Sequence, residues 1–128
     1  MWTFETFAPV QDFGAFDYQI DAAAFDRWVA LYPDDAAHRP LVPPGMAVSV
    51  MMRAYMALLQ PRPPGNIHAG QHLHIHRLAR IGDTMTTSLA CVAKELRKER
   101  RWVTFETKTR DAAGDLLFTG RLTSIWAK

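Results

Sequence analysis

The most informative residues for chemistry in this chain begin with the stretch between Leu41 and Ile75. This stretch opens with Pro-Pro-Gly45-Met46 and continues as an apolar run in which Arg53 is the only charge. The pattern predicts a helix over about residues 46–59 that is buried on most sides. The first N–H groups of a helix have no partner within it, and its amino end carries roughly half a positive charge. This helix start is therefore predicted to hold a ligand oxygen.

A stretch with period two follows from Ile67 and carries four histidines. His68 stands where the strand begins, and it has two interpretations: contact with a bound ligand, or a hydrogen bond to a loop carbonyl. Gln71 shares a face with apolar residues, so it needs a partner if it is buried. Three imidazoles on the opposite face could bind zinc, but same-face neighbours on a strand are about 7 Å apart. We interpret them as a solvent-facing stripe and predict no metal: His72, His74 and His76.

A basic run is the third feature. It consists of Lys94, Arg97, Lys98, Arg100 and Arg101, interrupted by two glutamates. One interpretation is a solvated hairpin turn. The other is a patch that attracts a phosphorylated ligand such as the nucleotide end of coenzyme A, with Arg97, Lys98 and Arg100 as the phosphate contacts. No aromatic stacking pattern accompanies the run, and the net charge is only +2. Nucleic acid is therefore not a predicted partner.

The elements that must position these residues follow from periodicity. Asp21 is predicted to cap a helix over 22–32, and Pro33 ends it. A short strand is predicted over 16–20, and a proline-rich loop over 32–44. Further strands are predicted over 67–75, 84–94, 101–110 and 116–127, with a hairpin signal at Asp111 to Asp115. Long strands joined by short turns predict an antiparallel meander around the apolar helix, an α+β domain.

Length and composition set the outer limits. The 128 residues suffice for one domain, 1–128, and the hydrophobic share of 48% is ordinary for a soluble globular protein. No apolar run reaches the roughly 18 residues of a membrane span, and the first residues do not resemble a signal peptide. The single Cys91 allows no disulfide within the chain, so a cytoplasmic location is expected. Arg53 is expected to pair with Asp83 or Glu106, or to line a tunnel.

Three phrases resemble the hotdog fold, specifically the MaoC-like acyl dehydratase group. They are Pro-Pro-Gly45-Met, Ile67-His-Ala-Gly-Gln71 and Arg80-Ile-Gly-Asp-Thr84, within a resemblance that covers about residues 12–127. It implies a curved antiparallel sheet wrapped around one buried central helix, in a homodimer whose sheets join edge to edge. It also implies an acyl thioester of coenzyme A or a carrier protein as substrate. Backbone N–H groups of Gly45 and Met46 would bind the thioester oxygen and stabilise its enolate-like form.

The same resemblance implies a catalytic pair. MaoC-like hydratases carry an Asp-x-Asn-Pro-x-His motif before the helix, and the corresponding loop here reads Asp34-Asp35-Ala-Ala-His38-Arg-Pro. It lacks Asn-Pro and is shorter. His38 with Asp34 or Asp35 would move the proton, because histidine titrates near neutral pH and a carboxylate orients it. The alternative is that these are ordinary loop residues. Carrier-protein dehydratases have a carboxylate one turn into the helix, where this chain has Ser49. Ser49 is expected to contact the substrate, together with His68 and Gln71.

The leading functional hypothesis is therefore hydration of a 2-enoyl thioester, or dehydration of a 3-hydroxyacyl thioester, without a metal or redox cofactor. A second hypothesis is a non-catalytic acyl-binding subunit beside another hotdog chain, which would explain the altered motif. A third is a thioesterase, but the predicted helix has no carboxylate to position water.

Overall fold

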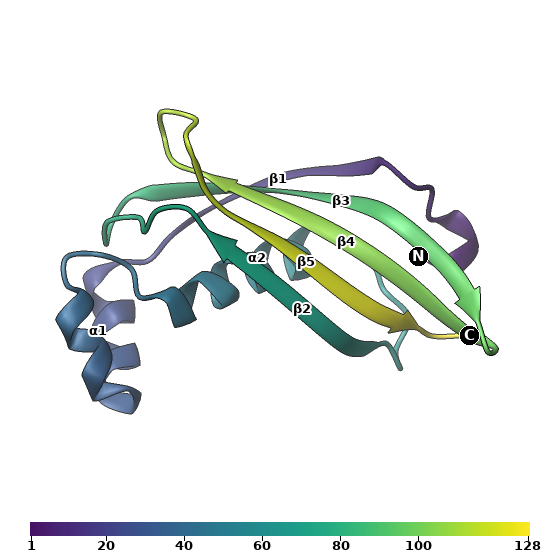
Figure 1. Ribbon diagram of the computed structural model, residues 1–128, viewed down its shortest axis with the longest axis horizontal. Helices are drawn as coiled ribbons and strands as arrows, with labels where there is room; N and C mark the ends of the chain where they lie inside the picture. Colours follow the sequence, from purple (N-terminus) through teal and green to yellow (C-terminus); the bar gives the residue numbers. More distant parts are fainter.

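The computed structural model describes residues 1–128 as one curved antiparallel sheet lying over a helix, with a second helix at one end (Figure 1). In chain order the elements are the 3-10 helix η1 (Phe4–Thr6), β1 (Gln11–Gln19), α1 (Ala22–Leu31), the 3-10 helix η2 (Pro33–His38), α2 (Pro44–Leu58), β2 (Ile67–Ile75), β3 (Thr84–Arg97), β4 (Arg100–Arg110) and β5 (Leu116–Trp126). The α+β class is confirmed. No helix has both the length and the apolar composition needed to cross a membrane.

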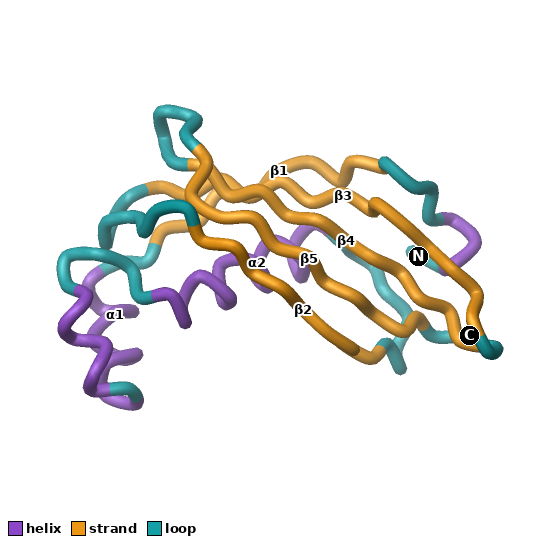
Figure 2. The backbone as a smooth tube through the Cα atoms, viewed as in Figure 1, coloured by secondary structure: helices purple, strands orange, loops and turns teal.

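The strand order in the sheet is β1-β3-β4-β5-β2. Strands β3, β4 and β5 form the predicted meander, but β2 pairs with β5 and not with β3, so the simple meander is wrong at one connection (Figure 2). After β2 the chain crosses the sheet to β3, which lies beside the other edge strand, β1. On this crossing, Arg80 forms an isolated antiparallel β-bridge with Leu41. The Gly82 N–H then donates a hydrogen bond to the Ile20 carbonyl oxygen at 2.8 Å. Periodicity identifies strands but not their neighbours, which depend on contacts distant in sequence.

The helix ends follow their local chemistry. The Asp21 carboxylate accepts a hydrogen bond from the Ala24 N–H at 2.7 Å, which confirms the predicted cap. Helix α2 begins at Pro44, two residues before the predicted start, because a proline suits the first helical position. The predicted loop over 32–44 instead contains η2, which begins at Pro33 for the same reason. Its two aspartates lie in the first turn, where a helix favours negative charge.

Strand β1 is longer than predicted, starting at Gln11 and not at Phe16. A bulge interrupts its pairing with β3 between Asp12 and Ala15. Gly14, within the bulge, has a φ of 92°, a conformation open to glycine. Because the bulge breaks the alternation of side chains, the sequence pattern did not reveal the first half of this strand.

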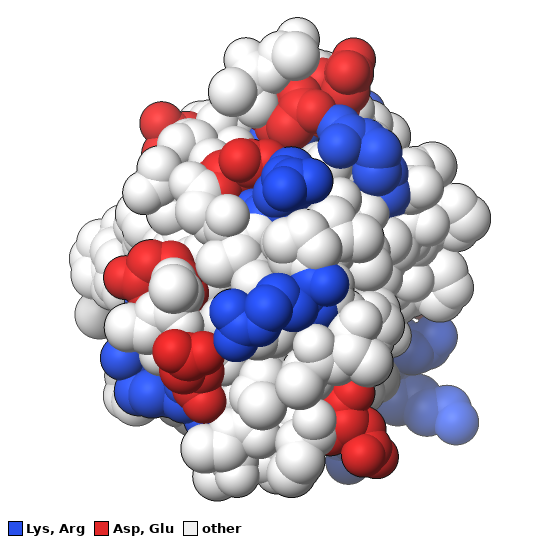
Figure 3. All heavy atoms as spheres, turned by 90° about the vertical axis from the view of Figure 1, so that its left-hand side faces the viewer, with Lys and Arg blue, Asp and Glu red and all other residues white.

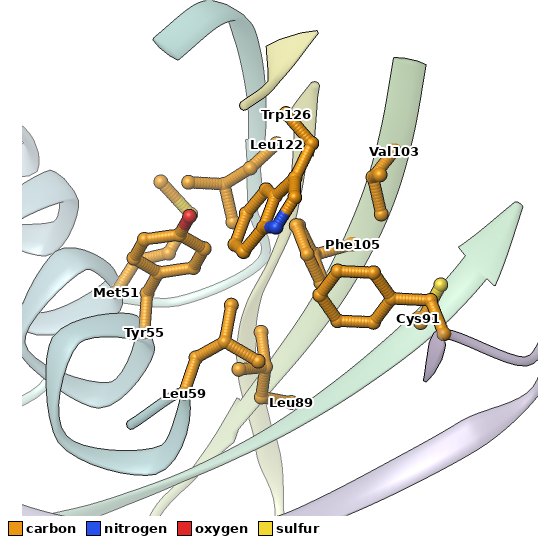
Figure 4. Close-up of a cluster of buried hydrophobic side chains, with 10 residues drawn as sticks. Met51, Tyr55, Leu59, Leu89, Cys91, Val103, Phe105, Leu122 and Trp126 are labelled. Atoms are coloured by element: carbon orange, nitrogen blue, oxygen red, sulfur yellow. The ribbon is translucent and has the colours of Figure 1, made fainter. Parts of the chain in front are cut away.

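One face of α2 packs into the concave side of the sheet. Its buried residues are Met46, Ala47, Val50, Met51, Ala54 and Tyr55. The second half of the helix joins a cluster that contains Phe105, Leu122 and Trp126 (Figure 4). The first half joins a separate cluster with Phe25 of α1 and Phe118 of β5. The other face of α2 is open, and the Met56 side chain is 47% exposed. The prediction of burial on most sides is therefore wrong for the single chain.

Helix α2 packs closely against the sheet at Gly120 on β5. This residue is buried, and a Cβ atom there would meet the Met51 sulfur and would stand 2.6 Å from the Thr107 hydroxyl oxygen. The space that a side chain would occupy is taken by α2 and by a neighbouring strand. Glycine at this position therefore leaves room for the Met51 side chain of α2 against the sheet.

We predict that Gly120→Ala lowers the free energy of unfolding by about 1–3 kcal/mol, because the added methyl group overpacks the interface between α2 and the sheet. Gly70→Ala is the matched control on the edge strand β2, where a Cβ would have no atom within 4 Å. Urea denaturation followed by circular dichroism measures both variants. Equal stability of the two variants would contradict the close packing at Gly120.

Candidate active site

Three side chains meet beside the start of α2. The Trp28 indole N–H donates a hydrogen bond to an Asp35 carboxylate oxygen at 2.7 Å. The other Asp35 oxygen lies 3.9 Å from His38 Nε2. Residues three apart eclipse one another in a 3-10 helix, so η2 places Asp35 and His38 on the same side. The two side chains are 27% and 39% exposed, within reach of solvent and of a ligand.

The structure distinguishes the two aspartates that the sequence left open. Asp34 is exposed and takes part in no hydrogen bond or ion pair through its side chain. Asp35 bonds Trp28 and faces His38. Sequence analysis did not single out Trp28 as a site residue, because its spacing assigned it to the apolar face of α1. Its link to Asp35 crosses the helix break at Pro33, and no local pattern predicts such a contact.

Trp28 also connects this pair to the start of α2. A Cβ atom at Gly45 would stand 2.9 Å from Trp28 Cζ2, so the indole lies directly against the glycine. The Met46 N–H donates to the Pro43 oxygen at 3.0 Å, whereas the Gly45 N–H has no acceptor within the protein. Of the two predicted donors, Gly45 is thus the one free to bind a ligand oxygen.

Two hollows adjoin this corner. The first, of about 250 Å³, lies between α1, α2 and β1, and its lining includes Trp28, Met46 and Ser49. The second, of about 590 Å³, is an open groove along the outward face of α2, bordered by Phe16 of β1. Ser49 lines both hollows, and its hydroxyl donates to the Met46 oxygen at 3.0 Å. The predicted substrate-contacting serine therefore lies at the wall of available space.

The remaining predicted substrate residues lie elsewhere in the chain. His68 and Gln71 are exposed on the edge strand β2, opposite Ser124 and Leu122 of β5. Strand β2 begins at the end of the sheet away from α1, whereas Gly45 lies against Trp28 of α1, so one chain does not bring the start of β2 to Gly45 (Figure 1). The histidine stripe is exposed, as predicted: His72, His74 and His76. No group of three or more His, Cys, Asp or Glu side chains is placed to hold a metal ion.

The basic residues Arg97, Lys98 and Arg100 form the turn between β3 and β4. Together with Trp102 they line a surface hollow, and the Arg97 guanidinium lies 4.7 Å from the Trp102 ring centre. This turn is at the end of the sheet opposite α1 (Figure 1). Strand β3, which ends at this turn, is itself roughly 40 Å long over its 14 residues. The face at the α1 end carries acidic and basic groups interspersed (Figure 3). The structure thus does not bring the basic turn to the Trp28 corner within one chain.

We predict that Asp35→Ala lowers the free energy of unfolding by about 1–3 kcal/mol, because it leaves the half-buried Trp28 N–H without an acceptor. Asp34→Ala is the matched neighbour and should change stability by less than about 0.5 kcal/mol. Thermal and urea denaturation of both variants measure the difference. A larger loss for Asp34→Ala would mean that the partner of Trp28 has been misassigned.

No protein-family model matches the chain, and a search of curated proteins finds no similar sequence. Solved structures do match. The MaoC-like dehydratase from Rhodospirillum rubrum superposes with a TM-score of 0.82 at 18% identity, covering 100% of this chain and 99% of that one. An (R)-hydratase from A. caviae superposes with a TM-score of 0.74 at 23% identity, covering 96% of this chain and 99% of that one.

A third match is the ChsH1-ChsH2 complex from Mycobacterium tuberculosis, with a TM-score of 0.73 at 13% identity, covering 94% of this chain and 98% of that one. These similarities span almost the whole length of each chain. The chain therefore has the α+β hotdog fold, the architecture it shares with MaoC-like dehydratases and (R)-hydratases, as the sequence resemblance predicted.

Proposed function

We propose that the protein is a hydratase or dehydratase of acyl thioesters, adding water to a 2-enoyl thioester or removing it from a 3-hydroxyacyl thioester. One observation carries the proposal: the Asp35–His38 pair lies at the same corner as the free N–H of Gly45, with Trp28 in contact with both. A proton carrier and an oxyanion donor are the two groups that this reaction needs. The (R)-hydratase and the MaoC-like dehydratase with the same fold support the reaction class.

The proposed hydration proceeds through an enolate. The thioester oxygen accepts a hydrogen bond from the Gly45 N–H at the positive end of α2, which stabilises the negative charge that develops there. A water held by His38 and Asp35 gives its oxygen to the β-carbon and one proton to the pair. The pair then gives this proton to the α-carbon of the enolate, so that the double bond is lost and the pair regains its starting state. The reaction involves no net redox change and therefore needs no redox cofactor, and the proposal includes no metal.

The 3.9 Å between Asp35 and His38 fits this role. Hydrogen bonds between catalytic groups are often long in a protein without substrate and shorten in the complex. Neither group is deeply buried, so a water can reach both of them. Trp28 supports the pair by holding the Asp35 carboxylate in one orientation through the 2.7 Å bond.

The proposed assembly is a homodimer, or a heteromer with another hotdog subunit. Strands β1 and β2 are the two edges of the sheet, and Ile67 on β2 is 57% exposed. An unpaired edge strand with an exposed apolar side chain is suited to pairing with a second sheet. The match to a complex named for two chains, ChsH1 and ChsH2, supports the heteromer as the alternative arrangement. In that case this chain would be the acyl-binding, non-catalytic subunit.

We predict that the protein hydrates crotonyl-CoA, and that His38→Ala lowers kcat/KM by about 10²–10⁴-fold through loss of the proton carrier. His72→Ala is the control, because this exposed histidine lies on β2 outside the proposed site. The loss of absorbance of the conjugated thioester measures the rate. Thiol release is measured in parallel.

Each other outcome identifies a different function. Release of free thiol, with no hydration of the double bond in the thioester that remains, would indicate a thioesterase. This outcome is not expected, because no carboxylate lies on α2. Activity that appears only after addition of a second hotdog subunit, and that is unaffected by His38→Ala, would indicate the non-catalytic subunit. Full activity of His38→Ala in the protein alone would refute the proposed pair.

The basic turn remains a proposed phosphate contact for coenzyme A, and in the proposed dimer it would serve the site of the other subunit, because one chain does not bring it to its own Trp28 corner. Replacing Arg97, Lys98 and Arg100 together by glutamine should raise KM for an acyl-CoA at least about tenfold, the value of one charge-assisted hydrogen bond. KM for the matching pantetheine thioester, which lacks the nucleotide, should not change. An equal change for both thioesters would show that the turn does not bind the phosphates.

A further inference from the structure

The open groove along α2 begins at Ser49, about one helical turn after the proposed oxyanion donor Gly45. Ser49, Met52 and Met56 lie four, seven and eleven positions after Gly45, so all three share its face of the helix. They line the groove together with Phe16, Arg53 and Ala57. The smaller hollow beside Trp28 has Ser49 and Arg53 in its wall as well. An apolar chain could therefore lie along α2 from the Gly45 end.

Arg53 is the charged group of this groove and has no acidic partner. The expected pairs with Asp83 or Glu106 do not form, since Glu106 instead pairs with Arg121 at 3.3 Å. The Arg53 guanidinium lies 4.6 Å from the Tyr18 ring centre. Arg27, in the wall of the smaller hollow, likewise takes part in no ion pair. No Asp or Glu lines either hollow, so both present uncompensated positive charge.

Geometry places this charge at the far part of a bound chain. Arg53 is eight residues after Gly45, about 12 Å along the helix axis. A guanidinium presents a planar fork of donors that matches a carboxylate, and stacking on an aromatic ring leaves the edge of that fork available. A hydrophobic chain ending in a carboxylate would satisfy the apolar wall and Arg53 at once.

We propose that the preferred substrate class is an acyl thioester whose chain carries a carboxylate at its far end, and that Arg53 is the specificity-determining residue. This rests on the proposed function, which places the thioester at Gly45. Methionine side chains along the groove accommodate the methylene segment, because thioethers are flexible and polarisable. The Tyr18 ring holds the guanidinium over the groove.

Calorimetric titration of the full chain with decanoyl-CoA and decanedioyl-CoA tests the proposal. The two differ only in the terminal carboxylate, and neither can be hydrated. The protein should bind the diacid thioester at least tenfold more tightly. Arg53→Met should remove this preference while retaining decanoyl-CoA binding, and Arg53→Lys should keep part of it. Arg121→Met, on the opposite face of the sheet, is the matched control and should bind both as the unchanged protein does.

Two results would overturn the proposal. If Arg53→Met lost the same amount of binding affinity for both thioesters, Arg53 would be assigned to a phosphate of coenzyme A, the other anion within reach. The second result is that the unchanged protein binds neither thioester and that Arg53→Met changes the oligomeric state. This result would assign the groove to a second copy of the chain. Because titration does not require turnover, an Arg53-dependent preference without hydration of any enoyl thioester would refute the proposed reaction and leave the carboxylate site standing.

Discussion

The depth at which α2 lies in the sheet is the constraint on which the rest of the structure depends. Gly120 permits that depth, because the Met51 sulfur and the Thr107 hydroxyl occupy the place of a side chain. With Met51 in that place, the buried row of α2 faces the sheet. Its buried row then joins two hydrophobic clusters, one in each half of the helix. Its opposite row becomes the open groove.

The candidate site follows from the same placement. Seating α2 brings its amino end against α1, where the Trp28 indole packs on Gly45 and donates to Asp35. The site therefore draws on three elements joined by short connections, α1, η2 and α2. Its Asp35–His38 pair is partly exposed, so solvent screens the attraction between the two groups. Packing and local helix geometry, more than ion pairing, hold these residues in position.

Much of the fold was predictable because it depends on local rules. The cap at Asp21, the start of α2 near Gly45 and the bounds of β2 follow from side-chain chemistry and periodicity. The bulge in β1 was missed because an extra residue breaks the alternation. Of the site, His38 and Gly45 were predictable from family resemblance and helix-end chemistry. Trp28 was not, since its contacts to Asp35 and Gly45 depend on how two helices cross.

The sequence by itself determined which segments are helices and strands, that one helix is apolar with a lone arginine, and which groups could do acid–base chemistry. Only the tertiary structure decided that β2 pairs with β5, that Asp35 and not Asp34 faces His38, and that Arg53 has no acidic partner. The physical reason is the distance along the chain over which each effect acts. Propensity, capping and periodicity act over a few residues, whereas strand order and pairing across elements depend on which distant surfaces exclude water together.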